Sequence, residues 1–236
     1  MIYTISDIHG NYDKYKKMLE TIKFAPNDIL YVLGDVIDRG PDGFKIMLDM
    51  AQRPNVVNLM GNHEAMAMKA ISGILRTIGT DGVGMNEEEK QAKELWFWNG
   101  GELSLADFFW LDNEQETIVW EYMKAMLLYK ELEVNGRKFI LLHGGLENFT
   151  PDRPLMDYAP REILWCRPEP DTVYYPDRYV VFGHTPVQHL NLRAGLENVP
   201  AKIYHGDHII DIDCGCVFPS GRLGCLCLDT MEEFYV

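Results

Sequence analysis

The chain has 236 residues, of which 47% are hydrophobic, and a formal net charge of −14. This length suffices for one large core, and an acidic surface repels nucleic-acid phosphates, so we expect a single domain over 1–236 and no nucleic-acid partner. Five cysteines, an odd number, do not suggest a disulfide scaffold. No apolar run could span a bilayer and no secretory segment precedes the first motif, so we expect a cytoplasmic protein with no membrane partner.

The first 75 residues repeat one pattern three times: an apolar strand, a polar turn and a helix. Short apolar runs indicate the strands, and apolar positions at helical spacing indicate the helices. The expected strands cover 2–5, 29–33 and 56–60, and the expected helices cover 11–22, 41–50 and about 64–75. Because a crossover helix returns the chain to the same edge of a sheet, such units favour parallel strands.

The segment 76–130 differs, because it predicts helices at 87–98, 103–110 and 114–128 after a loop at 79–84. We expect it to form a helical insertion. Aromatic residues are concentrated in it: Trp96, Trp98, Phe108, Phe109, Trp110, Trp120 and Tyr122. These side chains form either a satellite core of the insertion or one wall of a substrate groove.

The remainder is rich in strands. Asn135-Gly136 between two apolar runs is a strong signal for a β-hairpin, and 149–177 reads as a loop. Further strands are expected at 178–182, 209–213, 214–217 and 223–228, the last three antiparallel. Two Cys-x-Cys pairs would then face each other across a hairpin, either as a zinc site or as buried thiols: Cys214/Cys216 and Cys225/Cys227. The fold class is therefore mixed α/β.

Polar side chains follow five of the expected strands, mostly beside a glycine. They are Asp7 and His9; Asp35, Asp38 and Arg39; Asn62 and His63; His143; and His184. Any one of these turns alone could be routine, and Asn-His-Glu alone could be a helix cap. Five in order predict a shared site, and mixed carboxylate, imidazole and amide ligands suit two divalent first-row metal ions. The other histidines, His189, His205 and His208, are expected to be structural or exposed.

These segments resemble the motif series of the calcineurin-like metallophosphoesterases. Within that superfamily they resemble the phosphoprotein phosphatase branch, which includes phage lambda phosphatase and bacterial Ser/Thr protein phosphatases. The resemblance implies a four-layer αββα sandwich, with two mixed β-sheets flanked by helices and a helical insertion. Ser6 replaces a glycine common in the family, which changes no ligand. The motifs are Ser6-Asp7-Ile8-His9-Gly10, Gly34-Asp35-Val36-Ile37-Asp38-Arg39-Gly40, Gly61-Asn62-His63-Glu64, His143-Gly144-Gly145 and Gly183-His184.

The resemblance also implies a metal centre with two divalent ions. We expect Mn, with Fe or Zn as alternatives, and in-line attack on phosphorus by a metal-bridging hydroxide without a covalent phosphoenzyme. The implied ligands of the first ion are Asp7, His9 and Asp35. Those of the second are Asp35, Asn62, His143 and His184, so that Asp35 bridges.

The implied catalytic residues are His63, Asp38 and Arg39. His63 would protonate the leaving alkoxide while Asp38 orients it. Arg39 and Asn62 would bind the phosphate. A second phosphate-binding arginine is expected at Arg167, which lies in a stretch resembling the Trp-x-Arg of lambda phosphatase, and Arg161 is its rival.

The expected function is a Ser/Thr protein phosphatase that hydrolyses phosphomonoesters of a phosphorylated protein or peptide. The alternative is a symmetrical dinucleoside tetraphosphate hydrolase or a broad-specificity phosphodiesterase, with a nucleotide phosphoester as substrate. Asp38-Arg39 favours the first, because the tetraphosphatases that resemble this chain usually differ at these two positions. A non-catalytic binding module would have lost a ligand or the acid, and this chain retains all of them.

Overall fold

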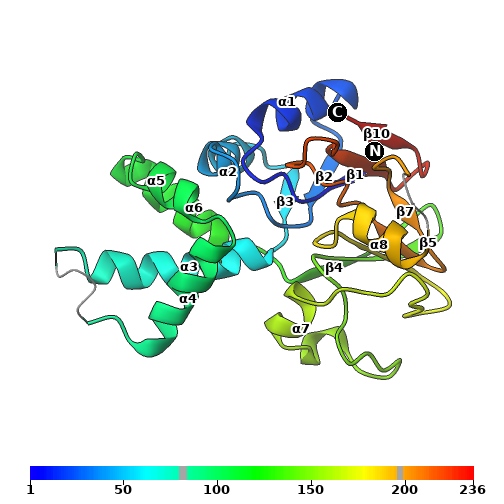
Figure 1. Cartoon of the computed structure of the whole chain (residues 1–236). Coiled ribbons are helices and arrows are strands. Elements are labelled where there is room, and N and C mark those ends of the chain that lie inside the picture. The colour runs from blue at the N-terminus through cyan, green and yellow to red at the C-terminus, as the bar shows by residue number, and fades with distance from the viewer. Residues whose placement is uncertain (80–83, 196–198) are drawn as a thin grey trace.

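The computed structural model describes residues 1–79, 84–195 and 199–236, and in these the strands form two five-stranded sheets (Figure 1). In order across the first sheet, the strands are β10 (Glu233–Tyr235), β9 (Gly224–Cys227), β1 (Ile2–Ile5), β2 (Ile29–Val32) and β3 (Val56–Asn58). Those of the second are β4 (Tyr129–Val134), β5 (Arg137–Leu142), β6 (Tyr179–Phe182), β8 (Ile209–Asp211) and β7 (Tyr204–His205).

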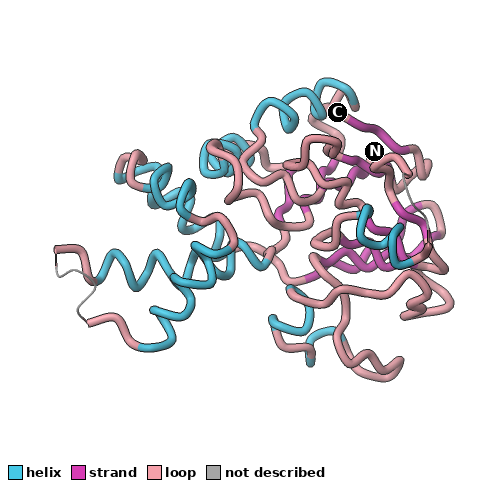
Figure 2. The backbone as a smooth tube through the Cα atoms, viewed as in Figure 1, coloured by secondary structure: helices cyan, strands magenta, loops and turns pink. Residues whose placement is uncertain are grey.

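The helices lie outside the two sheets (Figure 2). They are α1 (Tyr12–Thr21), α2 (Gly43–Ala51), α3 (Asn62–Arg76), α4 (Glu87–Trp98), α5 (Glu102–Phe108), α6 (Asn113–Lys124), α7 (Pro160–Leu164) and α8 (Val187–Arg193), with a 3₁₀ turn at Leu155–Asp157. Within the described residues, no helix combines the length and the apolar composition needed to cross a membrane.

Both sheets are mixed, as predicted. In the first sheet β1, β2 and β3 are parallel, whereas β9 is antiparallel to β1 and to β10. In the second, β5, β6 and β8 are parallel, and β4 and β7 add antiparallel edges. Each sheet therefore has three parallel strands whose carboxyl ends lie at one edge, where ligands collect in α/β folds.

Three apolar layers hold the sheets and helices together. Along β2, Leu30 packs under the helices of the first half, whereas Tyr31 faces the space between the sheets. Along β5, Leu141 faces that same space and Ile140 packs on the other side, with Ile163 of α7. This period-2 alternation follows from strand geometry. It produces the four-layer order helix, sheet, sheet, helix that the resemblance implied.

The insertion extends to one side of the sheets, with α3 and α4 packed along each other (Figure 1). Its buried aromatics do not form a satellite core, so that prediction is wrong. Trp96 and Phe108 belong to the same apolar cluster as β2, because α5 and α6 pack against α2 and bring Phe108 to 5.5 Å from the ring of Phe44. Trp98 and Trp110, by contrast, are 89% and 88% exposed.

Several predicted boundaries shift. The helix expected from Glu64 begins at Asn62, because Gly61 takes the N-cap position. The helix expected to reach Leu128 ends at Lys124, because Leu127 instead pairs with the edge of β3. A short helix, α7, interrupts the loop expected at 149–177. Residues 80–83 of the loop expected at 79–84 lie outside the described part of the chain.

The hairpin at Asn135-Gly136 is confirmed, with φ of 51° and 77° as its tight turn requires. Of the C-terminal strands, β9 pairs antiparallel with β1 and β10, and β8 pairs antiparallel with β7 and parallel with β6, but the predicted pairing of these strands with one another is wrong. Residues 214–217 form a turn, and β8 and β9 lie in different sheets, so the two Cys-x-Cys pairs do not face each other across a hairpin. All four cysteines of these pairs are free and buried, as expected for thiols packed in a core.

Candidate metal centre

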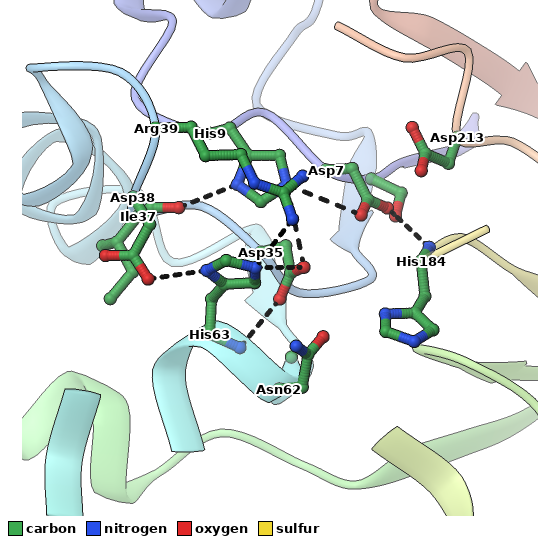
Figure 3. A network of polar contacts seen from close by, with 12 residues as sticks. Asp7, His9, Asp35, Ile37, Asp38, Arg39, Asn62, His63, His184 and Asp213 are labelled. Carbon is green, nitrogen blue, oxygen red and sulfur yellow. Dashed lines mark hydrogen bonds and ion pairs between the residues drawn. The ribbon is translucent and has the colours of Figure 1, made fainter. Parts of the chain in front are cut away.

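The two sheets bring the predicted polar side chains to one place (Figure 3). Asp7 follows β1, Asp35 follows β2, Asn62 begins α3 directly after β3, His143 follows β5 and His184 follows β6. All five side chains are buried, with 5% or less of their surface exposed. Buried charged groups and imidazoles need polar partners, and here these side chains are partners for one another.

The backbone of these turns is strained. The following residues, none of them glycine, adopt positive φ between 48° and 71°: Asp7, His9, Asp35, Asp38, Arg39 and His184. Such conformations are uncommon away from glycine and cluster at functional sites, where the surrounding structure holds them in place.

Glu64 holds the most important of these turns. Its carboxylate accepts hydrogen bonds from the backbone N–H groups of Asp35 at 2.9 Å, Val36 at 2.8 Å and Gly61 at 3.0 Å. A side chain at Gly61 would overlap Asp35, so the backbones can approach only with glycine there. The sequence motif contains Glu64 but does not predict a role for it. Its complete burial and its contacts with backbone N–H groups show that it supports these turns.

Asp35 lies at the middle of the cluster. Its Oδ2 is 3.8 Å from Nε2 of both His9 and His63, and its Oδ1 is 3.4 Å from Nε2 of His143. Asp7 joins through Oδ1, which is 3.9 Å from Nε2 of His9. Asp35 is therefore placed to contribute one oxygen to each of two cations.

Among the described residues, two groups of side chains could each hold a metal ion, and Asp35 belongs to both. The group Asp35, His143 and His184 matches three of the four ligands expected for the second ion. The fourth, Asn62, places Oδ1 2.8 Å from Nε2 of His143. The other group contains His9 and Asp35, which are two of the ligands expected for the first ion. Its third member is His63, whereas the expected third ligand is Asp7.

The imidazole rings direct their Nε2 atoms toward the centre. Nδ1 of His9 donates to the carbonyl of Ile37 at 3.0 Å and Nδ1 of His143 to that of Leu33 at 2.7 Å, which leaves each Nε2 for the centre. Burial lowers the pKa of His9 and of His184 well below the usual value, which favours neutral rings. Nε2 of His184 is buried without a hydrogen-bond partner among the described residues, and a metal ion would supply one.

The pKa values of His143, Asp7 and Asp35 depend on the charges of their neighbours as well as on burial. Burial opposes protonation of His143, but the charge of Asp35 prevails and raises its pKa to about 9. Burial and the neighbouring Asp35 raise the pKa of Asp7. Burial would also raise the pKa of Asp35, but His143 and His63 hold it well below its usual range.

His63 and Asp38 form the expected pair. Nδ1 of His63 is 2.6 Å from Oδ2 of Asp38 (Figure 3). Because a carboxylate only accepts hydrogen bonds, Nδ1 carries the proton and Nε2 faces the centre. Burial opposes a charge on His63, but Asp35 and Asp38 outweigh it and raise its pKa above the usual value.

Two guanidinium groups reach the centre from solvent. Arg39 places Nη1 2.9 Å from Nε2 of His9 and Nη2 3.1 Å from Nε2 of His63. Arg167 donates from Nη1 to the carbonyl of His184 at 2.6 Å, and its charge acts on Asp7. The rival Arg161 is an exposed residue of α7 with no such contact to the centre.

Asp213 is a site residue that sequence reasoning missed. It follows β8, is buried, and lies beside Asp7 in Figure 3. Its Oδ1 accepts a hydrogen bond from the N–H of Gly215 at 2.9 Å, and burial together with Asp7 raises its pKa well above the usual value. The signal resembles that at the other turns, an apolar strand followed by an acid with a glycine two residues further on, but the pattern predicts that the strand runs through this position.

Hollows open on both sides of the centre. One, of 310 Å³, is lined by His9 and Arg39 together with the acids Asp13 and Asp42. The other, of 280 Å³, is lined by Asn62 and Trp165 together with Lys69, whose ammonium is paired with Glu88.

A larger hollow of 530 Å³ continues outward past Lys69 and Glu88 to Trp120, an aromatic residue of the insertion. Among the residues lining these three hollows, the cations are therefore Arg39 at the centre and the paired Lys69.

Comparisons with known proteins identify the family of this arrangement. The family model described as calcineurin-like phosphoesterase matches residues 1–210. The chain is 29% identical over 177 residues to serine/threonine-protein phosphatase 2 of Salmonella typhimurium, covering 70% of this chain and 67% of the relative. It is 26% identical over 230 residues to the symmetrical bis(5'-nucleosyl)-tetraphosphatase of Baumannia cicadellinicola, covering 96% of this chain and 68% of the relative.

The similar solved structures support the fold alone, because their sequences have diverged. One, described provisionally as a diadenosine tetraphosphatase, superposes with a TM-score of 0.66 at 18% identity and covers 100% of this chain and 92% of its own. Another, a protein serine/threonine phosphatase of Saccharomyces cerevisiae, has a TM-score of 0.58 at 15% identity and covers 95% of this chain and 71% of its own.

Proposed function

Because the chain belongs to the calcineurin-like phosphoesterase family, whose members are hydrolases, we propose that it hydrolyses the phosphomonoesters of phosphoserine and phosphothreonine in protein substrates. The observation that carries this proposal is the distribution of charge around the centre. Two guanidiniums border the centre, Arg39 beside Nε2 of His9 and Arg167 at the carbonyl of His184, and such a pair suits a single phosphoryl group. The hollow beside His9 presents the carboxylate of Asp13, which would repel the further phosphates of a tetraphosphate chain.

The centre is proposed to hold two divalent ions, with Mn as the first choice and Fe or Zn as alternatives. Their ligands would be Asp7, His9, Asp35, Asn62, His143 and His184. When bound, such ions supply positive charge that polarises the phosphoryl group and lowers the pKa of a bound water. The buried, unpartnered Nε2 of His184 and the central position of Asp35 support this assignment.

The protein's own residues supply orientation and a proton. Arg39 and Arg167 would bind the phosphate oxygens and stabilise the charge that develops on them, with the amide of Asn62 beside them. His63 would donate the proton on Nε2 to the leaving alkoxide of serine or threonine. Its raised pKa favours the protonated ring that this step requires. Asp38 holds the ring through Nδ1.

A second candidate function is symmetrical hydrolysis of a dinucleoside tetraphosphate. The tetraphosphatase relative aligns with 96% of this chain, and the hollow of 530 Å³ is lined by Trp120, which offers a face on which a base could stack. This candidate keeps the same centre and changes the leaving group.

The deciding experiment compares two substrates with Mn-loaded protein. We expect kcat/KM for a phosphoserine or phosphothreonine peptide to exceed that for diadenosine tetraphosphate by roughly 10-fold or more, because an acid–phosphate contact costs about 1–2 kcal/mol at a protein surface. A phosphotyrosine peptide of matched sequence reports the selectivity among protein phosphates. Preference for the dinucleotide would reject the protein phosphatase assignment and support the second candidate.

A further inference from the structure

The helical insertion contacts the turn that carries the candidate acid–base pair. From α4, the indole Nε1 of Trp96 donates to Oδ2 of Asp38 at 2.7 Å. From α5, Oγ of Ser104 accepts the backbone N–H of Asp38 at 2.8 Å. Between the two helices, the carbonyl of Gly100 accepts the N–H of Arg39 at 3.2 Å. The insertion thus supports a backbone segment whose φ angles, 71° and 65°, are strained.

Trp96 and His63 donate hydrogen bonds to the same carboxylate oxygen of Asp38. Oδ2 of Asp38 accepts both the indole N–H and Nδ1–H of His63, whereas Oδ1 is buried with no hydrogen-bond partner among the described residues. Trp96 and His63 are therefore the side chains that fix the rotation of this carboxylate. Without the indole, the carboxylate could turn about its last side-chain bond and His63 would lose a single preferred orientation.

Resting on the proposed function, we propose that Trp96 is a positioning residue for proton donation by His63. The indole N–H holds the Asp38 carboxylate, the carboxylate holds Nδ1–H of His63, and Nε2 of His63 thereby stays directed at the leaving oxygen. Trp96 touches neither the substrate nor the centre itself. It acts through Asp38.

The packing around Trp96 holds its indole N–H in a fixed position. Its side chain is fully buried, and a side chain on Gly101 would overlap the indole ring, so glycine is required where the chain leaves the helix. A buried tryptophan N–H normally finds an acceptor, and a carboxylate is a stronger one than a neutral carbonyl. Trp98, two residues further along the same helix, points to solvent and provides a matched control.

The kinetic test uses Trp96→Phe and Trp98→Phe with two phosphomonoesters, a phosphoserine peptide and p-nitrophenyl phosphate. The serine alkoxide needs a proton to leave, whereas nitrophenolate leaves readily without one. We expect Trp96→Phe to lower kcat on the peptide about 10- to 100-fold, because this is the usual effect of losing a hydrogen bond to a charged group. The loss of kcat on p-nitrophenyl phosphate should be much smaller, and KM should not change for either substrate. Trp98→Phe should match the wild type. An equal loss on both substrates in Trp96→Phe would overturn the proposal.

A double mutant separates positioning from general damage. If Trp96 acts through His63, Trp96→Phe should add no further loss of kcat in a His63→Asn background. An additional loss of 10-fold or more in that background would reject the proposal. Failure of the proposed function gives a different result, because then the wild-type protein would turn over neither phosphomonoester.

A spectroscopic readout needs neither turnover nor metal. In metal-free protein, the Nδ1–H of His63 should give a single hydrogen-bonded resonance in the wild type and in Trp98→Phe, and more than one resonance in Trp96→Phe. Unchanged His63 signals in Trp96→Phe would contradict the proposal. Should that variant not fold, Asp38→Asn provides the second test, because it should shift the indole N–H resonance of Trp96, and an unshifted resonance would overturn the assignment.

Discussion

At the scale of single residues, one carboxylate controls the charge of the centre. Asp35 lies within 4 Å of Nε2 of His9, His63 and His143. Its negative charge raises the pKa of His143 to about 9, whereas burial keeps His9 neutral. A metal ligand must offer a lone pair, so a cation that binds here competes with the proton on His143.

This competition predicts proton release on metal binding. The pKa of His143 is raised to about 9, so the ring is protonated at pH 7 in metal-free protein and must lose that proton when its Nε2 binds Mn²⁺. His9 and His184, whose pKa values are lowered, should release none. Calorimetric titration with Mn²⁺ at pH 7, in buffers of different ionisation enthalpy, should show at least one proton released, with affinity rising toward pH 9. No proton release at pH 7 would contradict the charge state assigned to His143.

A second residue-scale prediction concerns the two arginines that the sequence could not separate. Arg167 contacts the backbone of His184, whereas Arg161 is exposed on α7. Arg167→Ala should lower kcat/KM for a phosphopeptide about 10- to 100-fold, the effect of losing a hydrogen bond to a charged group. Arg161→Ala, the control, should stay within twofold of the wild type. Equal effects of the two substitutions would remove Arg167 from the phosphate site.

At the scale of elements, α3 is fixed to the centre by its first turn. Glu64 binds backbone N–H groups on both sides of the site, at Asp35 and Val36 after β2 and at Gly61 before the helix. The Asn-His-Glu motif therefore combines a candidate ligand, a candidate acid and a structural acceptor in consecutive residues. The last of these holds the backbone from which the other two project.

Glu64→Ala should therefore lower the stability of the fold. It leaves at least three N–H groups without their acceptor in a buried site, and we expect the free energy of unfolding to fall by about 3–5 kcal/mol. Urea unfolding of metal-free protein measures the change. Glu87→Ala, at an exposed position on α4, is the control and should change stability by no more than about 0.5 kcal/mol. A loss below about 1 kcal/mol for Glu64→Ala would show that water replaces the carboxylate at little cost.

The elements also show what the sequence could and could not predict. Apolar runs ending in Asp7, Asp35 or His143 predict both the strand and the side chain at its end, because the pattern is local. Which strands pair is not local, and so the pattern predicts one hairpin for C-terminal strands of which β8 and β9 lie in different sheets. Likewise, helical spacing places Trp96 and Trp98 on different faces of α4, but only the packing of the insertion decides which face meets Asp38.

At the scale of the whole molecule, the centre joins the two sheets. Asp7, Asp35 and Asn62 come from the parallel strands of the first sheet, and His143 and His184 come from those of the second. Between the sheets lies an apolar layer that includes Leu33 and Leu141. Ions bound by ligands from both sheets would tie them together at the edge of this layer.

Metal binding should therefore stabilise the entire fold rather than the site alone. A ligand at about 100 times its Kd adds about 2.7 kcal/mol to the free energy of unfolding, and for a chain of this length that raises Tm by roughly 5–10 °C. Because Asp35 lies between both groups of ligands, Asp35→Asn should lower the content of both metals and abolish most of the rise in Tm.

Thermal unfolding with and without Mn²⁺, together with metal analysis, measures both effects. His205→Ala is the control, since His205 pairs with Glu233 away from the centre and should leave the rise intact. If Asp35→Asn kept its metal content and its rise in Tm, this carboxylate could not be the bridge between the sheets. If the rise were lost while one equivalent of metal remained, the two ions would bind independently, and only the ion held by ligands from both sheets would stabilise the fold.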